Sequence, residues 1–156
     1  MLKLQQKLQA GFTIIELLIV IAIIGILATL VLTNFQGAQA KGRDTVRKND
    51  INSIYQKLEE YYNENGGYPD ATLAASTFAG IDAGALTDAE GATIVSTFTN
   101  SATAPTLNPT TTNEYAYAAY GAGCAVTVNG HSCGKYVLAT FLERETPAKY
   151  EKVSLN

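Results

Sequence analysis

The chain has 156 residues, with 11 Lys and Arg against 14 Asp and Glu, which gives a formal net charge of -3. That length suffices for one domain plus one long accessory element, because domains usually run about 100–150 residues. No Lys or Arg lies between Lys57 and Lys135, whereas this interval holds eight acidic residues. A surface of that sign repels phosphate, so we expect no direct nucleic-acid binding.

Residues 12–35 form an apolar segment in which Glu16 is the only charge. At about 1.5 Å per residue, a helix of this length measures roughly 36 Å and can cross a hydrocarbon core of about 30 Å. A leader with Lys3 and Lys7 precedes the segment and favours a cytoplasmic N-terminus. Ala38-Gln39-Ala40 resembles a secretory cleavage site, but the apolar run exceeds the usual signal-peptide length of about 7–15 residues.

A charged carboxylate inside a membrane helix is costly, so such a residue usually has a partner or a function. The residues around Glu16 read Gly11-Phe12-Thr13-Ile14-Ile15-Glu16-Leu17-Leu18. This run resembles the prepilin cleavage motif of type IV pilins and type II secretion pseudopilins. The resemblance continues through the apolar run to Ala28 and, more weakly, as far as Tyr68-Pro69.

The resemblance implies that a membrane prepilin peptidase cuts between Gly11 and Phe12 and that Phe12 is then N-methylated. After that cut, Glu16 lies about 6 Å along the helix from the new amino group. In a filament core, the amine of one subunit can pair with Glu16 of a staggered neighbour, where the lack of water strengthens the pair. Phe12 and Glu16 are therefore the predicted subunit-assembly residues. An anchored domain that never polymerises gains nothing from this carboxylate.

The apolar helix departs from the family pattern in one place. The family usually carries proline where this chain has Thr33, and Gly25 precedes it in the same helix. An interior glycine weakens a helix by about 1 kcal/mol against alanine, whereas an interior proline costs about 3 kcal/mol. We therefore expect a continuous helix, with any flexibility centred on Gly25.

Beyond the apolar run, the helix is predicted to continue to about Asn63, because apolar residues follow 3, 4 spacing on one stripe. The members of this stripe are Val46, Ile51, Ile54, Tyr55, Leu58, Tyr61 and Tyr62. The turn-forming run 63–67 and Pro69 then stop the helix.

A basic cluster follows the apolar run on the same helix and consists of Lys41, Arg43, Arg47 and Lys48. Its charge opposes the membrane orientation that the leader favours, so the orientation with the N-terminus inside rests on the expected disulfide, the absence of other apolar spans and the family resemblance. Three interpretations of the cluster remain open: contact with lipid headgroups, contact with acidic heads of neighbouring subunits, or a solvated helix face.

Residues 71–113 are rich in Ala, Thr, Gly, Ser and Asn, which predicts exposed connecting structure with a short helix near 88–98. Asp82, Asp88 and Glu90 raise a calcium hypothesis, because calcium takes several oxygen ligands. They do not follow the EF-hand pattern, so solvated loop charges are the preferred interpretation. We expect no metal and no cofactor.

The C-terminal part predicts three antiparallel strands, at residues 114–120, 135–143 and 150–155, with Asn129-Gly130 as a turn. Cys124 and Cys133 flank this turn, and a disulfide in an oxidising compartment is a more economical interpretation than two reduced thiols. His131 is the single histidine and fits a turn. With no nucleophile motif or phosphate loop, we expect no enzyme.

The expected fold is α+β and type IV pilin-like: a long N-terminal helix, half transmembrane and half amphipathic, packed on a small antiparallel β-sheet head. The expected boundaries are a removed leader at 1–11, a transmembrane and polymerisation helix at 12–35, its amphipathic continuation at 36–64, and the head at 65–156.

The resemblance implies a structural subunit of a type IV pilus, a homo-oligomeric extracellular fibre for adhesion, motility or surface contact. Its implied partners are the prepilin peptidase and methyltransferase, the pilus assembly platform and, before assembly, the cytoplasmic membrane with the N-terminus inside. The alternative is a pseudopilin of a type II secretion or DNA-uptake system.

Overall fold

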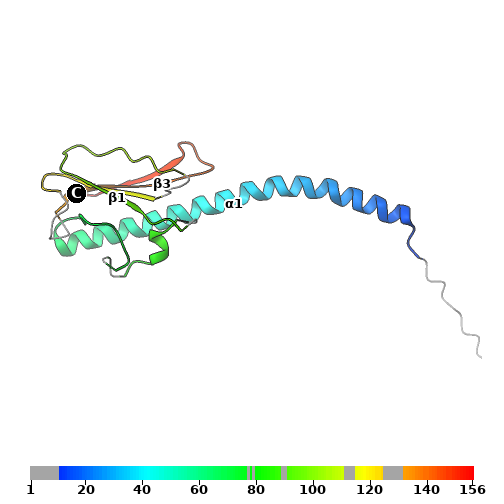
Figure 1. Cartoon of the computed structure of the whole chain (residues 1–156), viewed down its shortest axis with the longest axis horizontal. Helices are drawn as coiled ribbons and strands as arrows, with labels where there is room; N and C mark the ends of the chain where they lie inside the picture. The colour runs from blue at the N-terminus through cyan, green and yellow to red at the C-terminus, as the bar shows by residue number, and fades with distance from the viewer. Residues whose placement is uncertain (1–10, 77, 79, 89–90, 111–114, 125–131) are drawn as a thin grey trace, which may run out of the picture. The chain divides into compact units, whose positions relative to one another are not determined.

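The computed structural model describes residues 11–76, 78, 80–88, 91–110, 115–124 and 132–156. The predicted Asn129-Gly130 turn, His131, Glu90 and the leader up to residue 10 lie outside the described residues. The chain divides into two compact units, one up to Ala38 and one from Gln39 to Asn156. The elements are α1 (Ile14–Asn65), the 3-10 helix η1 (Ala83–Leu86), β1 (Val95–Thr99), β2 (Tyr115–Tyr120), β3 (Lys135–Phe141) and β4 (Lys149–Val153) (Figure 1).

Helix α1 is 52 residues long and stays helical through Gly25. It ends because Gly66 adopts a positive φ of 75° and its N–H donates to the Tyr62 carbonyl at 2.8 Å. This left-handed glycine is a common C-terminal cap, since glycine adopts the conformation without a steric penalty. Asn65 is the last helical residue, close to the predicted end at Asn63.

The sheet has four strands in the order β1-β2-β3-β4. Strands β2, β3 and β4 pair antiparallel, whereas β1 pairs parallel with β2. The α+β class with one long N-terminal helix is therefore confirmed, but the sheet is mixed and not wholly antiparallel.

The predicted helix near 88–98 is wrong, because β1 occupies Val95–Thr99. Two features decide against a helix there. Gly91 has a φ of 88° and sits in a turn closed between Asp88 and Ala92, where the Asp88 N–H donates to the Ala92 carbonyl at 2.9 Å. The run from Thr93 to Thr99 is rich in β-branched residues, which pack well on a pleated sheet and lose side-chain freedom in a helix.

The main core lies where the second half of α1 packs on one face of the sheet (Figure 1). Ile51, Ile54 and Leu58 of α1 are fully buried against sheet residues such as Tyr117 and Tyr136. The connecting segment also enters this core through Leu73, Phe78, Leu86 and Ile94. The prediction that 71–113 is exposed connecting structure is thus wrong for these four residues.

The opposite face of the sheet carries a smaller apolar cluster made of Ala118, Tyr120, Val137 and Ala139. Leu107, from the Thr-rich and Pro-containing loop after β1, is buried against it. The loop is also held by Lys149, whose Nζ donates to the Leu107 carbonyl at 3.5 Å. Leu107 of this connecting loop therefore covers part of the second face of the sheet.

Cys124 and Cys133 form a buried disulfide, and Cys133 lies beside the end of α1. The Tyr68 N–H donates to the Cys133 carbonyl at 2.7 Å, and the Cys133 N–H donates to the Tyr68 carbonyl at 3.4 Å. The disulfide therefore links two positions within the β2–β3 connection, and the two backbone hydrogen bonds join Cys133 to Tyr68, which follows the helix.

We expect a double replacement, Cys124→Ser with Cys133→Ser, to lower the free energy of unfolding by about 2–3 kcal/mol, because a closed loop of this size restricts the unfolded chain. Thermal unfolding of the detergent-solubilised chain, followed by tyrosine fluorescence, measures the loss. A reducing agent should lower the Tm of the parent chain and leave the variant unaffected. An unchanged Tm in the variant would contradict a stabilising role.

Candidate functional site

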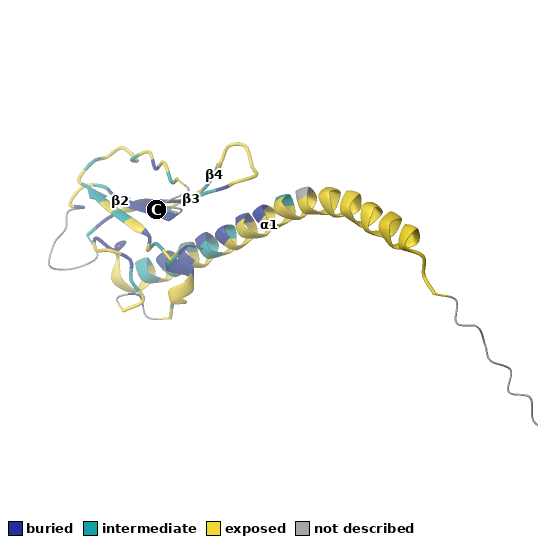
Figure 2. Cartoon of the chain, turned by 45° about the vertical axis from the view of Figure 1, so that its right-hand side comes forward, coloured by how far each residue is buried: buried dark blue, intermediate teal, exposed yellow. Residues whose placement is uncertain are grey.

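The N-terminal part of α1 presents apolar side chains in every direction. Every residue from Gly11 to Leu32 is exposed, including Phe12 at 93% (Figure 2). By length and composition, α1 can cross a membrane. A surface of this kind is stable in lipid or against other apolar helices, because exposing it to water costs free energy in proportion to its area.

Glu16 is bound to the residue that precedes the helix. Its Oε2 accepts from the Thr13 N–H at 2.8 Å and from the Thr13 hydroxyl at 2.7 Å. In return, the Glu16 N–H donates to Thr13 Oγ1 at 3.2 Å. This reciprocal arrangement is a capping box, which satisfies backbone donors that the first turn of a helix leaves open.

The capping box gives Thr13 a structural role that the sequence analysis missed. The signal was present, because Thr13 and Glu16 have the T-x-x-E spacing of a helix start ahead of an apolar run. The carboxylate thus has a partner within its own chain. Phe12 lies immediately before this cap, so a free amine on Phe12 would be created next to the only charge of the apolar segment.

Gly25 lies within the exposed part of α1. A methyl group added at its Cα would meet no other atom within 4 Å, so packing within this chain does not require glycine there. The predicted role of Gly25 in helix flexibility stays a prediction.

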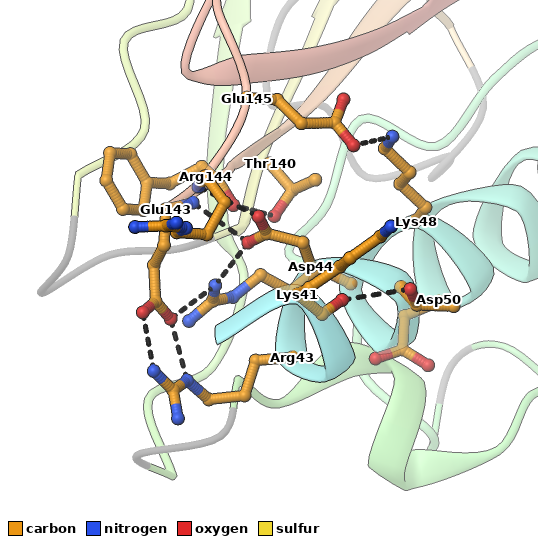
Figure 3. Close-up of polar contacts among 12 residues, drawn as sticks. Lys41, Arg43, Asp44, Lys48, Asp50, Thr140, Glu143, Arg144 and Glu145 are labelled. Atoms are coloured by element: carbon orange, nitrogen blue, oxygen red, sulfur yellow. Dashed lines mark hydrogen bonds and ion pairs between the residues drawn. The ribbon is translucent and has the colours of Figure 1, made fainter. Parts of the chain in front are cut away.

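The basic cluster is engaged within the head. Arg43 binds both carboxylate oxygens of Glu143, through Nε at 2.7 Å and a terminal nitrogen at 2.5 Å (Figure 3). Arg47 pairs with Glu143 at 2.8 Å and Lys48 pairs with Glu145. Both acids follow β3, in the connection to β4. These three side chains bind acids of their own head, a contact that none of the three open interpretations included.

Asp44 completes this contact from within the helix. Its two oxygens accept the backbone N–H groups of Glu143, at 2.8 Å, and of Arg144, at 2.9 Å. Arg47 also donates to Asp44 at 3.0 Å. We call this set the head clamp, and it consists of Arg43, Asp44, Arg47 and Lys48 on α1 with Glu143, Arg144 and Glu145. The clamp holds the β3–β4 connection against the helix.

Two members of the head clamp replace apolar residues on the buried stripe of α1. The stripe runs back from Ile51 through Arg47 and Asp44 to Ala40, and each of these residues is under 9% exposed. The prediction that Val46 belongs to the stripe is wrong, because Val46 is 58% exposed. Extending the 3, 4 spacing backward from Ile51 reaches Arg47 and Asp44, so a buried ion pair was readable from the sequence.

The head clamp makes the free energy of unfolding depend on pH. Hydrogen bonding from Arg43, followed by Arg47 and the charge of both, lowers the pKa of Glu143 from its ordinary 4.5 to about 2. Because the folded pKa lies below the unfolded one, the contribution is complete above pH 4.5 and is lost as the pH falls toward 2.

We therefore expect the free energy of unfolding to fall between pH 4.5 and 2, measured by urea titration of the solubilised chain at each pH. Glu143→Gln should be less stable at neutral pH and should flatten this part of the profile. Glu64→Gln, which changes an exposed acid on α1 outside the head clamp, is the matched control and should retain the parent profile. An unaltered slope in Glu143→Gln would remove Glu143 from this role.

The N-terminal segment matches known proteins. A family described as "Prokaryotic N-terminal methylation motif" matches residues 6–32. Type II secretion system core protein G of Pseudomonas aeruginosa is 39% identical over 66 residues, 42% of this chain and 46% of that protein. Type IV major pilin protein PilA of Myxococcus xanthus is 40% identical over 60 residues, 38% of this chain and 27% of that protein. Fimbrial protein EcpC of Eikenella corrodens is 38% identical over 77 residues, 49% of this chain and 50% of that protein.

The N-terminal segment is similar to those of pilins and pseudopilins. The predicted family resemblance is thereby confirmed. The chain spans half the length or less of the three curated relatives named above. No solved structure gives a significant match. The methylation motif and the apolar helix fit a membrane-anchored precursor.

Two of the three acids behind the calcium hypothesis, Asp82 and Asp88, have local roles. Asp82 caps η1 by accepting the Gly84 N–H at 2.9 Å, and Asp88 accepts the Ala92 N–H at 2.7 Å. Among the residues that the structure describes, no group of three or more His, Cys, Asp or Glu side chains is arranged to hold a metal ion.

Proposed function

We propose that this chain is a structural subunit of a type IV pilus, which polymerises through residues 12–35 into an extracellular fibre for adhesion, motility or surface contact. The observation that carries the proposal is a membrane-length helix, exposed on all sides, that begins with a capped Glu16 inside a methylation motif. An isolated chain leaves this surface uncovered, whereas lipid before assembly and neighbouring helices afterwards would cover it.

The proposal includes the maturation steps. A prepilin peptidase removes the leader 1–11 by cutting between Gly11 and Phe12, and a methyltransferase modifies the new Phe12 amine. The precursor spans the cytoplasmic membrane with its N-terminus inside, and a pilus assembly platform draws it into the fibre. There the Phe12 amine of one copy pairs with Glu16 of the next. Residues 36–64 carry the head, 65–156, outside the apolar core.

Electron microscopy of sheared surface material, combined with mass spectrometry of the N-terminus, tests this proposal. We expect long fibres whose subunits begin at N-methylated Phe12. A subunit beginning at Lys41 would show signal-peptide cleavage after Ala38-Gln39-Ala40 and would overturn the proposal. A variant with Gly11→Leu blocks the cut and should accumulate uncut precursor in the membrane without fibres.

A pseudopilin of a type II secretion or DNA-uptake system is the second candidate. It is favoured by the similarity to type II secretion system core protein G of Pseudomonas aeruginosa and of Aeromonas hydrophila. Both candidates share cleavage, methylation and polymerisation. They differ in the product, since a pseudopilus stays short and periplasmic. Fibres that are absent from the sheared fraction but recovered as short periplasmic polymers would favour the second candidate.

A further inference from the structure

A groove of about 580 Å³ opens on the head between α1 and the segment that contains η1. Val46 is the exposed apolar residue of its lining, which also includes Ala85, Tyr115 and the acidic residues Asp50, Asp82 and Asp88. Val46 is 58% exposed, and this side chain lines the groove.

The groove has an excess of negative charge. Its two arginines, Arg43 and Arg47, form ion pairs with Asp44 and Glu143 of the head clamp. No ion pair involves Asp50 or Asp82 in the part of the chain that the structure describes. The Tyr115 hydroxyl donates to Asp50 at 2.6 Å, but burial and the nearby Asp82 raise the pKa of the Asp50 carboxyl. A cation in the groove would therefore be stabilised.

Lys135 is a cation of the same head that has no ion pair among the described residues and is exposed at the start of β3. Strand β3 runs back along α1, since the Tyr136 hydroxyl reaches Glu59 at 2.9 Å and the Glu143 N–H reaches Asp44 at 2.8 Å. Lys135 is thus level with the part of α1 near Glu59, whereas the groove lies at residues 42–50. That difference corresponds to about 20 Å along the helix.

We propose that the groove receives Lys135 of a second copy of this chain, displaced by about 20 Å along α1. The inference rests on the proposed function, because parallel, staggered copies bring the groove of one head toward the β3 start of another. The lysine stem covers Val46 and Ala85 while its ammonium group meets Asp50 and Asp82. The groove and Lys135 are two different surfaces of the same chain. A contact between them can therefore repeat from copy to copy without closing into a ring, as a fibre requires.

Zero-length carbodiimide cross-linking of the fibres, with mass spectrometry of the linked peptides, tests the contact. Mixed fibres of isotopically labelled and unlabelled copies distinguish links between copies from links within one. We expect Lys135 linked to Asp50 or Asp82 of another copy. Lys135→Gln and Val46→Arg should abolish this link and reduce fibre yield by roughly two- to fivefold, as for a partly exposed ion pair.

The matched controls are Lys41→Gln, which removes another exposed lysine, and Thr45→Arg, which adds the same charge at an exposed position beside the groove. Both should retain the Lys135 link. Parent fibres that lack this link, or that link a different lysine to Asp50 and Asp82, would overturn the inference and leave the proposed function standing. Failure of the parent chain to form any polymer would overturn both.

Discussion

Glu16→Ala is expected to lower fibre yield on the order of tenfold or more, while cleavage after Gly11 and membrane insertion continue. The variant removes the carboxylate that the Phe12 amine of a neighbouring copy would meet in the apolar interior. An unpaired amine buried there is strongly unfavourable. Immunoblots of the sheared and membrane fractions measure polymer and processed precursor separately.

The capping box requires a control, because Glu16→Ala also removes the partner of Thr13. Thr13→Val keeps the carboxylate and loses the side-chain cap, which costs about 1 kcal/mol of local helix stability. Thr29→Val changes the same residue type within the exposed helix and serves as the matched variant. If Thr13→Val lowered fibre yield as much as Glu16→Ala, helix capping would explain the loss. Normal yield in Glu16→Ala would remove the pairing role.

Asp44→Ala is expected to lower the free energy of unfolding of the head by about 3–5 kcal/mol. The change leaves two backbone donors of the β3–β4 connection without their acceptor and leaves Arg47 buried without one of its partners. Because breaking a buried pair from one side leaves an uncompensated charge, the cost exceeds that of an exposed pair. The Tm of the solubilised chain should fall by roughly 10 °C or more.

Glu64→Ala removes an exposed acid from the same helix and should shift the Tm by little. A double replacement, Asp44→Ala with Arg47→Met, removes both charges and should recover part of the stability, since an apolar pair of similar volume often replaces a buried ion pair without loss. A Tm in Asp44→Ala equal to that of Glu64→Ala would show that the head clamp does not stabilise the head.

Sequence reasoning was accurate where one local pattern decides the structure. The helical first half of α1 follows from the apolar run, and the end of α1 follows from the glycines after Asn65. It was wrong where distant residues decide the structure. No residue close to Val95–Thr99 in the sequence identifies the partner of this strand, because β1 pairs parallel with β2, which begins only at Tyr115. Leu107 is buried for the same reason.

The sequence by itself determined a long N-terminal helix, the exposed apolar surface of its first half and the family of its N-terminal motif. These depend on composition and on spacings within a few residues, which nearby backbone geometry converts directly into structure. Only the tertiary structure decided that the basic cluster binds Glu143 and Glu145 and that Val46 faces an acidic groove. Such contacts join residues up to 100 positions apart, and packing alone selects which charges meet.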